Sequence, residues 1–209
     1  MFFGLRESKY GKRMDSVDIH WKKFLENGDE QSFSFIYNHH VDDLFCYGMS
    51  LGFQKETCKD ALQDIFFKLY TTKEKLHHVE NITAYLFKTF KHRLIDLSLK
   101  NRSGENIESY SESFTTHVSM LDDMIDRENS VLIRQKVESL LNSLTPNQRE
   151  VVYLKYMIGL QHREIAEVLG IHEESARKLL YRAMEKLRRY ASAEDLPEKL
   201  LLLILLSHL

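Results

Sequence analysis

The 209-residue sequence predicts an all-α protein, with two small helical domains joined by an acidic linker. The chain contains only 8 Gly and 2 Pro, too few turn-forming residues for a β-sandwich or a βαβ enzyme. Apolar residues recur at intervals of three and four along most of the chain, which is the period of an amphipathic helix. That pattern is lost between residues 101 and 130, where Asp, Glu, Ser and Thr dominate.

The first domain is expected at residues 15–100, as three amphipathic helices with a short helix at 17–25. Asp29 and Asn81 precede two of the apolar runs, and each can accept a hydrogen bond from the free amides of a helix start. The apolar residues of the three longer helices are expected to face one core. They are Phe33, Ile36, Tyr37, Val41, Leu44 and Phe45; Cys58, Ala61, Leu62, Ile65, Phe66 and Leu69; and Ile82, Tyr85, Leu86, Phe90, Leu94 and Leu97.

The second domain is expected at residues 131–190 and begins with an apolar helix at 131–141. Thr145, with Pro146 after it and Gln148 three residues on, predicts a capping box at the start of the next helix. Gly159 is expected to end that helix, and Gly170 to close a short helix at 162–169 as a left-handed C-cap. The inner faces of the last two helices are expected to be Ile165, Ala166 and Leu169, and Ala176, Leu179, Leu180, Ala183 and Leu187.

Residues 162–189 have the spacing of a helix-turn-helix, with Ala166 at the centre of the first helix and Ile171 in the turn. Such a motif places the N-terminal turns of its second helix in the DNA major groove. The side chains expected on that surface are His172, Glu173, Glu174, Ser175, Arg177, Lys178, Tyr181 and Arg182. A plain helical hairpin with a solvated basic face is the alternative interpretation.

Charge is distributed unevenly, although the whole chain has a net charge of only −2. Residues 85–102 carry five basic side chains against one acid, and residues 131–190 carry eleven against seven, so each segment is +4. The linker at 101–130 carries two basic and seven acidic side chains. We therefore expect two DNA-facing elements in a chain that binds duplex DNA poorly and in a salt-sensitive way when alone.

The helix after Asn81 interleaves aromatic and basic residues, an arrangement that can grip unstacked bases. Its cations are Lys88, Lys91, Arg93, Lys100 and Arg102, and its aromatic residues are Tyr85, Phe87 and Phe90. An ordinary helix with an apolar core face and a wet basic face would look the same. The sequence leaves both interpretations open.

Three other classes of protein compete with DNA binding. His39, His40, Asp42 and Asp43 could hold a metal in a helical phosphohydrolase, although no second helix offers matching ligands. The helix-turn-helix also suits a response-regulator transcription factor, which would need an α/β receiver domain before it. A helical adaptor would make no DNA contact. The two cysteines, Cys46 and Cys58, stand apart in apolar patterns, which favours reduced core thiols.

Four segments taken together resemble bacterial RNA polymerase sigma factors of the extracytoplasmic-function type, in the order of that family. GDEQSFSFIYNHHVDDLFCYGMSLG and KDALQDIFFKLY are similar to parts of region 2, NITAYLFKTFKHRLIDLSLKNR to its minus-10 helix, and the segment from Leu141 to Arg189 to region 4. The resemblance implies a non-enzymatic, cytoplasmic protein that needs no cofactor or metal. Its partners would be core polymerase, through the β′ and β subunits, promoter DNA and an anti-sigma factor.

The resemblance also implies roles for residues. Docking on a coiled coil of the β′ subunit falls to Asp60, Gln63, Asp64 and Phe66. Reading and melting of the minus-10 element falls to Tyr85, Lys88, Lys91, His92, Arg93 and Arg102, and minus-35 reading to His172, Glu174, Ser175, Arg177, Lys178, Tyr181 and Arg182. His92, Gln161, His172 and Leu179 depart from the family pattern, which puts the promoter sequence in question. The tail at 191–209 is unexplained by the family, and its apolar run, from Leu200 to Leu206, is too short to span a bilayer.

Overall fold

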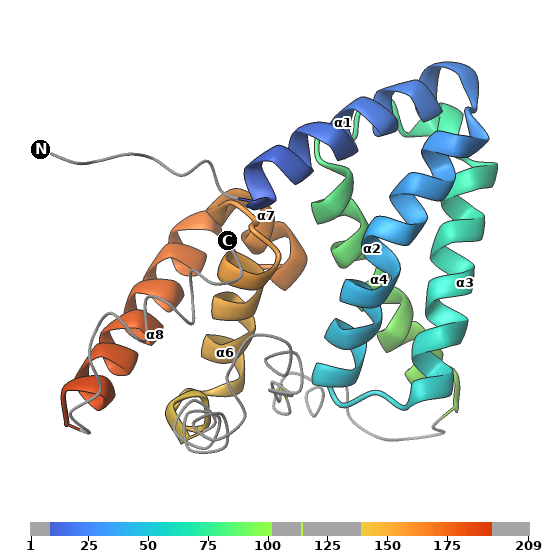
Figure 1. The fold of residues 1–209 in the computed structure, drawn as a ribbon. Coiled ribbons are helices and arrows are strands. Elements are labelled where there is room, and N and C mark those ends of the chain that lie inside the picture. The colour runs from blue at the N-terminus through green and yellow to red at the C-terminus, as the bar shows by residue number, and fades with distance from the viewer. Residues whose placement is uncertain (1–8, 102–113, 115–138, 194–209) are drawn as a thin grey trace, which may run out of the picture. The chain divides into compact units, whose positions relative to one another are not determined.

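The computed structural model describes residues 9–101, 114 and 139–193, and every element in that part of the chain is helical (Figure 1). The elements divide into two compact units. The first unit contains α1 (Lys9–Asn27), α2 (Glu30–Ser50), α3 (Lys55–Thr71), the 3₁₀ turn η1 (Lys73–Lys75) and α4 (Ile82–Asn101). The second contains α6 (Pro146–Val152), the π-helical turn η4 (Tyr153–Met157), α7 (His162–Leu169) and α8 (Glu173–Ala193).

Two parts of the sequence-based prediction fall mostly outside the described residues. The linker at 101–130 is described only at Asn101 and Phe114, and the tail only as far as Ala193. Of the helix expected at 131–141, residues 139–143 are described and are helical. None of the described helices is both long enough and apolar enough to cross a bilayer.

The helix starts of the first unit confirm the capping predictions. Asp29 Oδ2 accepts a hydrogen bond from the Ser32 amide at 3.0 Å, and Asn81 Oδ1 accepts one from the Ala84 amide at 2.9 Å. Hydrogen bonds from the Ser32 side chain and backbone lower the pKa of Asp29. The caps therefore fix where α2 and α4 begin.

The first helix of this unit is longer than predicted, because the apolar pattern starts only at Val17 while α1 begins at Lys9. Val17, Trp21 and Phe24 are buried one turn apart. The Trp21 Nε1–H donates to the Val79 carbonyl at 3.0 Å, which ties α1 to the segment before α4. The buried stretch is thus the part of α1 that sequence periodicity could detect.

Close approach of three helices occurs at Gly48 of α2. A Cβ atom at this position would lie 2.7 Å from Cys58 Sγ on α3 and 3.0 Å from Phe90 Cε1 on α4. Cys58 and Phe90 are fully buried. Gly48 therefore lets α2 pack directly against α3 and α4 in the core of the first unit.

The second unit confirms the capping box at Thr145. The Thr145 Oγ1 accepts from the Gln148 amide at 3.3 Å, and the Thr145 amide donates to Gln148 Oε1 at 3.1 Å, with Pro146 at the first helical position. The π-helical turn η4 after α6 was not predicted, because its apolar residues fit a continued α-helix equally well. Phe114 is buried and its ring lies 5.6 Å from that of Tyr153 in η4.

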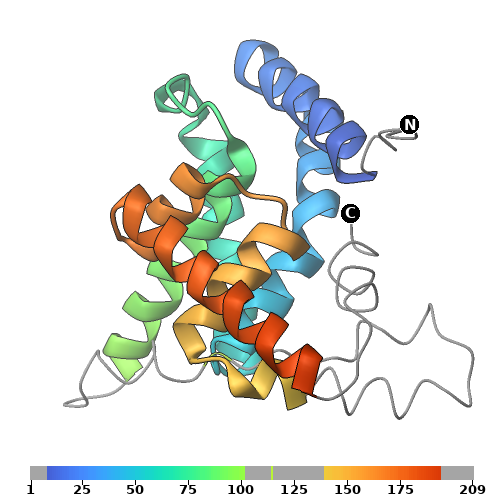
Figure 2. The same ribbon diagram turned by 90° about the vertical axis from the view of Figure 1, so that its left-hand side faces the viewer.

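Helix α8 lies alongside α6 and α7, as both views show (Figures 1 and 2). The turn between α7 and α8 depends on Gly170, which has φ 66° in the left-handed region and donates its amide to the Ala166 carbonyl. The predicted inner faces are mostly confirmed, since Ile165, Ala166, Ala176, Leu180, Ala183 and Leu187 are all buried. Leu169 and Leu179 are only half-buried, and Val168 is buried in α7.

Candidate functional site

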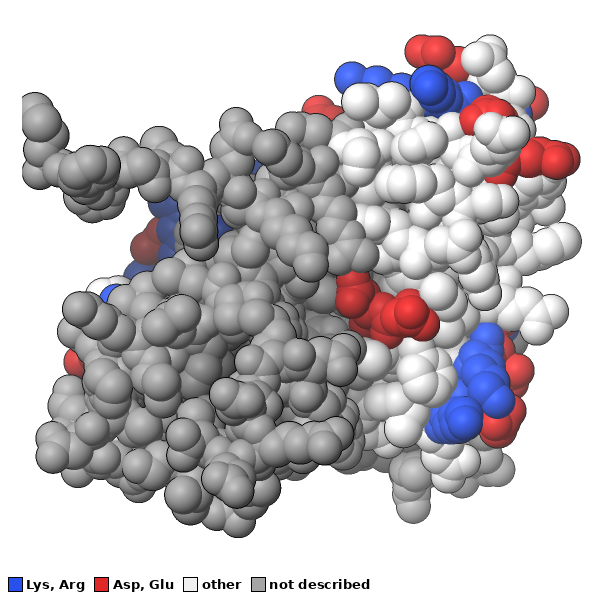
Figure 3. All heavy atoms as spheres, viewed as in Figure 1, with Lys and Arg blue, Asp and Glu red and all other residues white. Residues whose placement is uncertain are grey.

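An open groove of about 670 Å³ runs between α2 and α3 in the first unit. Its polar rim contains Asp42 on α2 and Lys59 and Gln63 on α3. The apolar lining residues are Phe33, Tyr37, Val41 and Phe45 of α2 and Leu62, Phe66, Phe67 and Tyr70 of α3. Charged side chains are sparse on the face of this unit seen in Figure 3.

The groove corrects the prediction that the whole apolar stripe of α2 faces the core. Ile36 and Leu44 are fully buried, but Phe33, Val41 and Phe45 are only half-buried and Tyr37 is exposed. The apolar stripe of α2 is wider than the part of it that packs against other helices, because no described helix covers the side that faces the groove. Contiguous exposed apolar surface of this kind is typical of sites where another protein binds.

Ring contacts hold the walls of the groove in place. Tyr37 meets Phe66 with ring centroids 4.7 Å apart, and Phe33 meets Tyr70 at 5.1 Å, both edge to face. The ring centroid of Phe24 on α1 lies 5.2 Å from that of Phe33. Such pairs add stability beyond the apolar area they bury, so the groove is a preformed feature.

The docking residues implied by the family resemblance are not equally placed. Asp60 and Gln63 are exposed on α3, and Gln63 lies at the groove. Phe66 lines the groove but is only 4% exposed, whereas the next residue, Phe67, is 69% exposed. Phe67 was missed as a docking residue, although helical periodicity already placed Phe66 in the core-facing stripe of α3 and left Phe67 outside it.

Asp64, the fourth of these residues, forms an ion pair with Arg93 of α4. The sequence placed Asp64 with polymerase docking and Arg93 with the minus-10 element. Both side chains are engaged with each other across the α3–α4 interface, which is an extensive helix contact of this unit. Their first role in the free chain is therefore to join these two helices.

Helix α4 separates its aromatic and basic residues more than the sequence suggested. Phe87 and Phe90 are fully buried, so they belong to the core and offer no stacking surface. Tyr85, Lys88 and Lys91 are half-buried and His92 is exposed. Arg102 lies outside the described residues, and the Lys100 side chain is likewise not described.

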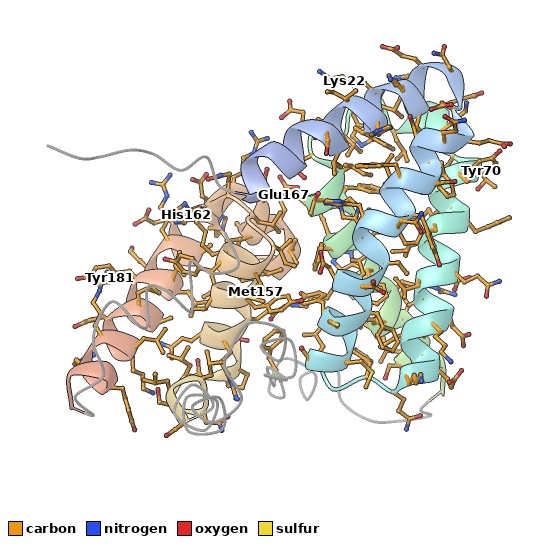
Figure 4. The ribbon with its side chains drawn as sticks, in the orientation of Figure 1. Lys22, Tyr70, Met157, His162, Glu167 and Tyr181 are labelled. Atoms are coloured by element: carbon orange, nitrogen blue, oxygen red, sulfur yellow. The ribbon has the colours of Figure 1, made fainter. Side chains whose placement is uncertain are left out.

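The predicted reading surface of α8 is open to solvent. Tyr181 is 66% exposed and projects from α8 away from α6 and α7 (Figure 4). The other predicted minus-35 residues are also exposed: His172, Glu174, Ser175, Arg177, Lys178 and Arg182. Two of the cations have acidic partners one turn earlier, Arg177 with Glu173 at 2.6 Å and Lys178 with Glu174 at 3.5 Å.

The start of α7 is linked electrostatically to α8. Burial, followed by the nearby positive charges of Lys155 and Arg177, lowers the pKa of His162. Lys155 Nζ donates to the Leu160 carbonyl at 3.2 Å, which holds the loop before α7. The lowered pKa favours the neutral form of His162, so this imidazole adds little charge beside Arg177.

The alternative metal site at His39, His40, Asp42 and Asp43 does not form. Within the described residues, no three His, Cys, Asp or Glu side chains gather closely enough to hold a metal. His40 is 1% exposed, with Nδ1 2.8 Å from the Ile36 carbonyl and Nε2 2.9 Å from Thr83 Oγ1. The contact with Thr83 joins α2 to α4, whereas the contact with Ile36 lies within α2. A response-regulator receiver would also require strands, and residues 9–101 contain none.

Comparison with known proteins matches the sequence of this chain to one family. Residues 134–187 match the family model described as Sigma-70, region 4. The chain is similar to the ECF RNA polymerase sigma factor SigM of Bacillus subtilis (strain 168), with 22% identity over 162 residues, 73% of this chain and 91% of SigM. It is also similar to SigW of that organism, with 26% identity over 179 residues, 80% of this chain and 92% of SigW.

A solved structure supports the arrangement of helices. The chain resembles CnrH, from a structure of CnrH in complex with the cytosolic domain of CnrY, with a TM-score of 0.53 and 20% identity. The match covers 86% of this chain and 99% of CnrH. At this level of identity the likeness concerns the fold alone.

Proposed function

The chain belongs to the sigma-70 family as an ECF sigma factor, a non-enzymatic protein that directs RNA polymerase to promoters, and we propose that separate surfaces perform the separate tasks. The groove face of α3 binds core polymerase. The exposed face of α4 binds the minus-10 element, and α8 binds the minus-35 element. The observation that carries this assignment is the open aromatic groove beside Gln63 on α3.

The polymerase surface consists of Asp60, Gln63 and Phe67 on α3, together with the groove beside them. A partner helix places apolar side chains in a groove of this type and polar ones on its rim. Asp42 and Lys59 supply rim charges of both signs. This geometry suits a coiled coil of the polymerase β′ subunit, with the β subunit contacting another part of the chain.

Truncation of Phe67 tests the docking assignment. Phe67→Ala is expected to weaken binding to purified core polymerase by at least about tenfold, because exposed aromatic anchors carry a large share of interface energy. Ile19→Ala on α1 is the matched control, since Ile19 is 54% exposed and lies outside the groove. Fluorescence anisotropy of labelled chain measures both affinities. Equal affinities for the two variants would remove the groove from the docking surface.

The minus-10 surface on α4 combines Lys88, Lys91 and His92 with the half-buried ring of Tyr85. Cations along one helix side can follow a single strand, and a ring at its edge can stack on an unstacked base. Because Phe87 and Phe90 are in the core, stacking falls to Tyr85 and His92. Arg93 stabilises α4 through its ion pair with Asp64. For Arg102, the sequence is the basis for proposing a contact with a phosphate.

The minus-35 surface on α8 is formed by His172, Glu174, Ser175, Arg177, Lys178, Tyr181 and Arg182. The helix-turn-helix geometry supports this assignment, since Gly170 turns the chain sharply and the buried face of α8 leaves these residues outward. Arg and Lys side chains at such positions contact guanine edges and phosphates.

The proposed partners of the whole chain are core RNA polymerase and promoter DNA, with an anti-sigma factor as regulator. The last of these is supported by the fold likeness to CnrH, which was solved with the cytosolic domain of another protein. We place the protein in the cytoplasm, without insertion into a membrane and without a cofactor, because its partners are there and its mechanism forms no covalent bond.

A further inference from the structure

The first two turns of α8 carry two acid–base pairs on its proposed DNA surface. Arg177 Nη2 lies 2.6 Å from Glu173 Oε1, and Lys178 Nζ lies 3.5 Å from Glu174 Oε1. In each pair the acid precedes the base by one turn, which is the favourable order along a helix. Arg182, one turn after Lys178, has no acid one turn before it. Glu185, three residues later, pairs with Arg189 at 3.7 Å, and Arg182 forms none of the α8 ion pairs in the described part of the chain.

These pairs change what the helix offers to a phosphate backbone. Binding to DNA of any sequence depends mainly on the number of phosphates that cations neutralise. A paired Arg or Lys brings almost no net charge to the surface, and its acid faces the same phosphates. Arg182 is therefore the cation of this face that contributes fully, while Arg177 and Lys178 contribute little.

The same pairs leave base reading intact. A guanidinium has five N–H donors in a rigid fork, and the contact with Glu173 is made by Nη2 alone. The remaining N–H groups of Arg177 can meet a base edge while Glu173 holds the fork in one orientation. Lys178 likewise has three donors and one acidic contact. Glu173 and Glu174 therefore weaken the sequence-independent attraction of α8 to phosphates more than they weaken its oriented hydrogen bonds to base edges.

We propose that Glu173 and Glu174 are specificity-determining residues, which weaken binding to non-promoter DNA more than binding to the promoter. This inference rests on the proposed minus-35 role of α8. It also accounts for a chain of net charge −2 that contains a DNA-reading helix: most of the phosphate contacts are left to the polymerase, and α8 supplies selection.

The first test measures binding of the full chain to a duplex of random sequence between low and moderate salt. Glu173→Gln and Glu174→Gln are each expected to tighten binding about two- to fivefold at low salt. Each is also expected to steepen the plot of log K against log salt by about 0.9, the value for one further neutralised phosphate. Arg182→Gln should flatten the plot by the same amount.

The matched control is Glu26→Gln, which changes the net charge equally but lies on α1 in the other unit, outside the groove. If Glu26→Gln shifts affinity and slope as much as the α8 variants do, net charge explains the effect and the proposal is overturned. Thermal melting of each variant shows whether the loss of an acid from the first turn of α8 has altered folding. A variant that melts early is replaced in the comparison by the other α8 variant.

The second test uses holoenzyme and a promoter taken from mapped start sites, in competition with random duplex. The ratio of promoter to random-DNA binding is expected to fall for Glu173→Gln and Glu174→Gln and to stay unchanged for Glu26→Gln. An equal gain on both DNAs overturns the inference while promoter-directed initiation by the unaltered chain still supports the proposed function. Absence of promoter-directed initiation overturns both.

Discussion

Arg93 on α4 places two nitrogens on one oxygen of Asp64 on α3, with Nη2 2.6 Å and Nε 2.7 Å from Oδ2. The two residues are 29 positions apart in sequence. The pair ties the helix proposed to bind polymerase to the helix proposed to bind the minus-10 element. The Asp64 side chain is 47% exposed and meets Arg93 through Oδ2, so its other oxygen can contact polymerase beside the exposed Asp60 and Gln63 while the pair stays formed.

A double-mutant cycle measures the strength of this link. Asp64→Asn and Arg93→Gln are each expected to lower the free energy of unfolding by up to about 1 kcal/mol, since both side chains are partly exposed to water. The double variant should lose less than the sum of the two, because they remove one shared interaction. Urea denaturation supplies all four values. Strict additivity would mean that the pair does not stabilise the fold.

The same variants separate a positioning role for Asp64 from a direct contact. If Asp64 acts only through Arg93, Asp64→Asn has no further effect on core polymerase affinity in the Arg93→Gln background. A clear further loss of affinity in that background would show that the carboxylate itself meets the polymerase.

Thr83→Val tests the buried link between α2 and α4. The change removes the hydroxyl that lies 2.9 Å from His40 Nε2, and we expect a loss of about 1–3 kcal/mol of stability because a buried polar group loses its partner. Thr89→Val on the same helix is the control, since Thr89 is only half-buried. Chemical denaturation compares them, and equal losses would contradict a specific role for the His40 contact.

Gly170→Ala tests the turn of the helix-turn-helix. The φ of 66° at Gly170 is unfavourable for a residue with a Cβ, although no atom lies within 4 Å of the place that a Cβ would occupy. We expect a loss of about 1–2 kcal/mol and a smaller loss for Gly170→Asn, since Asn tolerates the left-handed region better. Thermal melting decides, and an unchanged melting temperature for Gly170→Ala would contradict the assigned turn.

The two cysteines should be protected in the folded chain. Burial raises the pKa of Cys58 to about 11, and burial together with Asp43 and Asp42 raises that of Cys46. At pH 8 a thiol reagent such as DTNB is expected to label both slowly in the native chain and quickly after unfolding. Rapid labelling of Cys58 in the native chain would contradict its packing.

The raised pKa of Cys58 also determines whether the stability of the folded chain rises or falls with pH in the alkaline range. A thiol whose pKa is higher in the folded state than its ordinary value of 9.0 loses a proton more readily when unfolded. Its contribution to stability is complete below pH 9 and is lost as the pH rises from 9 towards 11. Replacement by alanine should flatten the stability profile in that interval.

Helix starts and the helix-turn-helix could be predicted from the sequence because their signals are local. Asp29, Asn81 and Thr145 each accept a hydrogen bond from the amide three residues later. A glycine at position 170 by itself favours the left-handed backbone conformation found there. These features need no knowledge of what lies across the fold.

The groove and the Asp64–Arg93 pair could not be predicted, because both depend on which helices meet. An apolar stripe shows that a side of α2 avoids water but not whether another helix covers it, so Tyr37 and Phe45 look the same as Ile36. The acidic partners of Arg177 and Lys178 were visible at helical spacing, but their pairing was established only by the distances.

Transcription from genomic DNA by core polymerase, with and without this chain, tests most directly whether the chain directs promoter selection when the 5′ ends of the RNAs are mapped. We expect discrete start sites that appear only with the chain and share sequence elements at the minus-10 and minus-35 positions. Phe67→Ala should lose these sites through weaker core binding, and Arg182→Gln should weaken use of the minus-35 element. Start positions identical to those of core polymerase alone would show that the chain does not direct promoter selection.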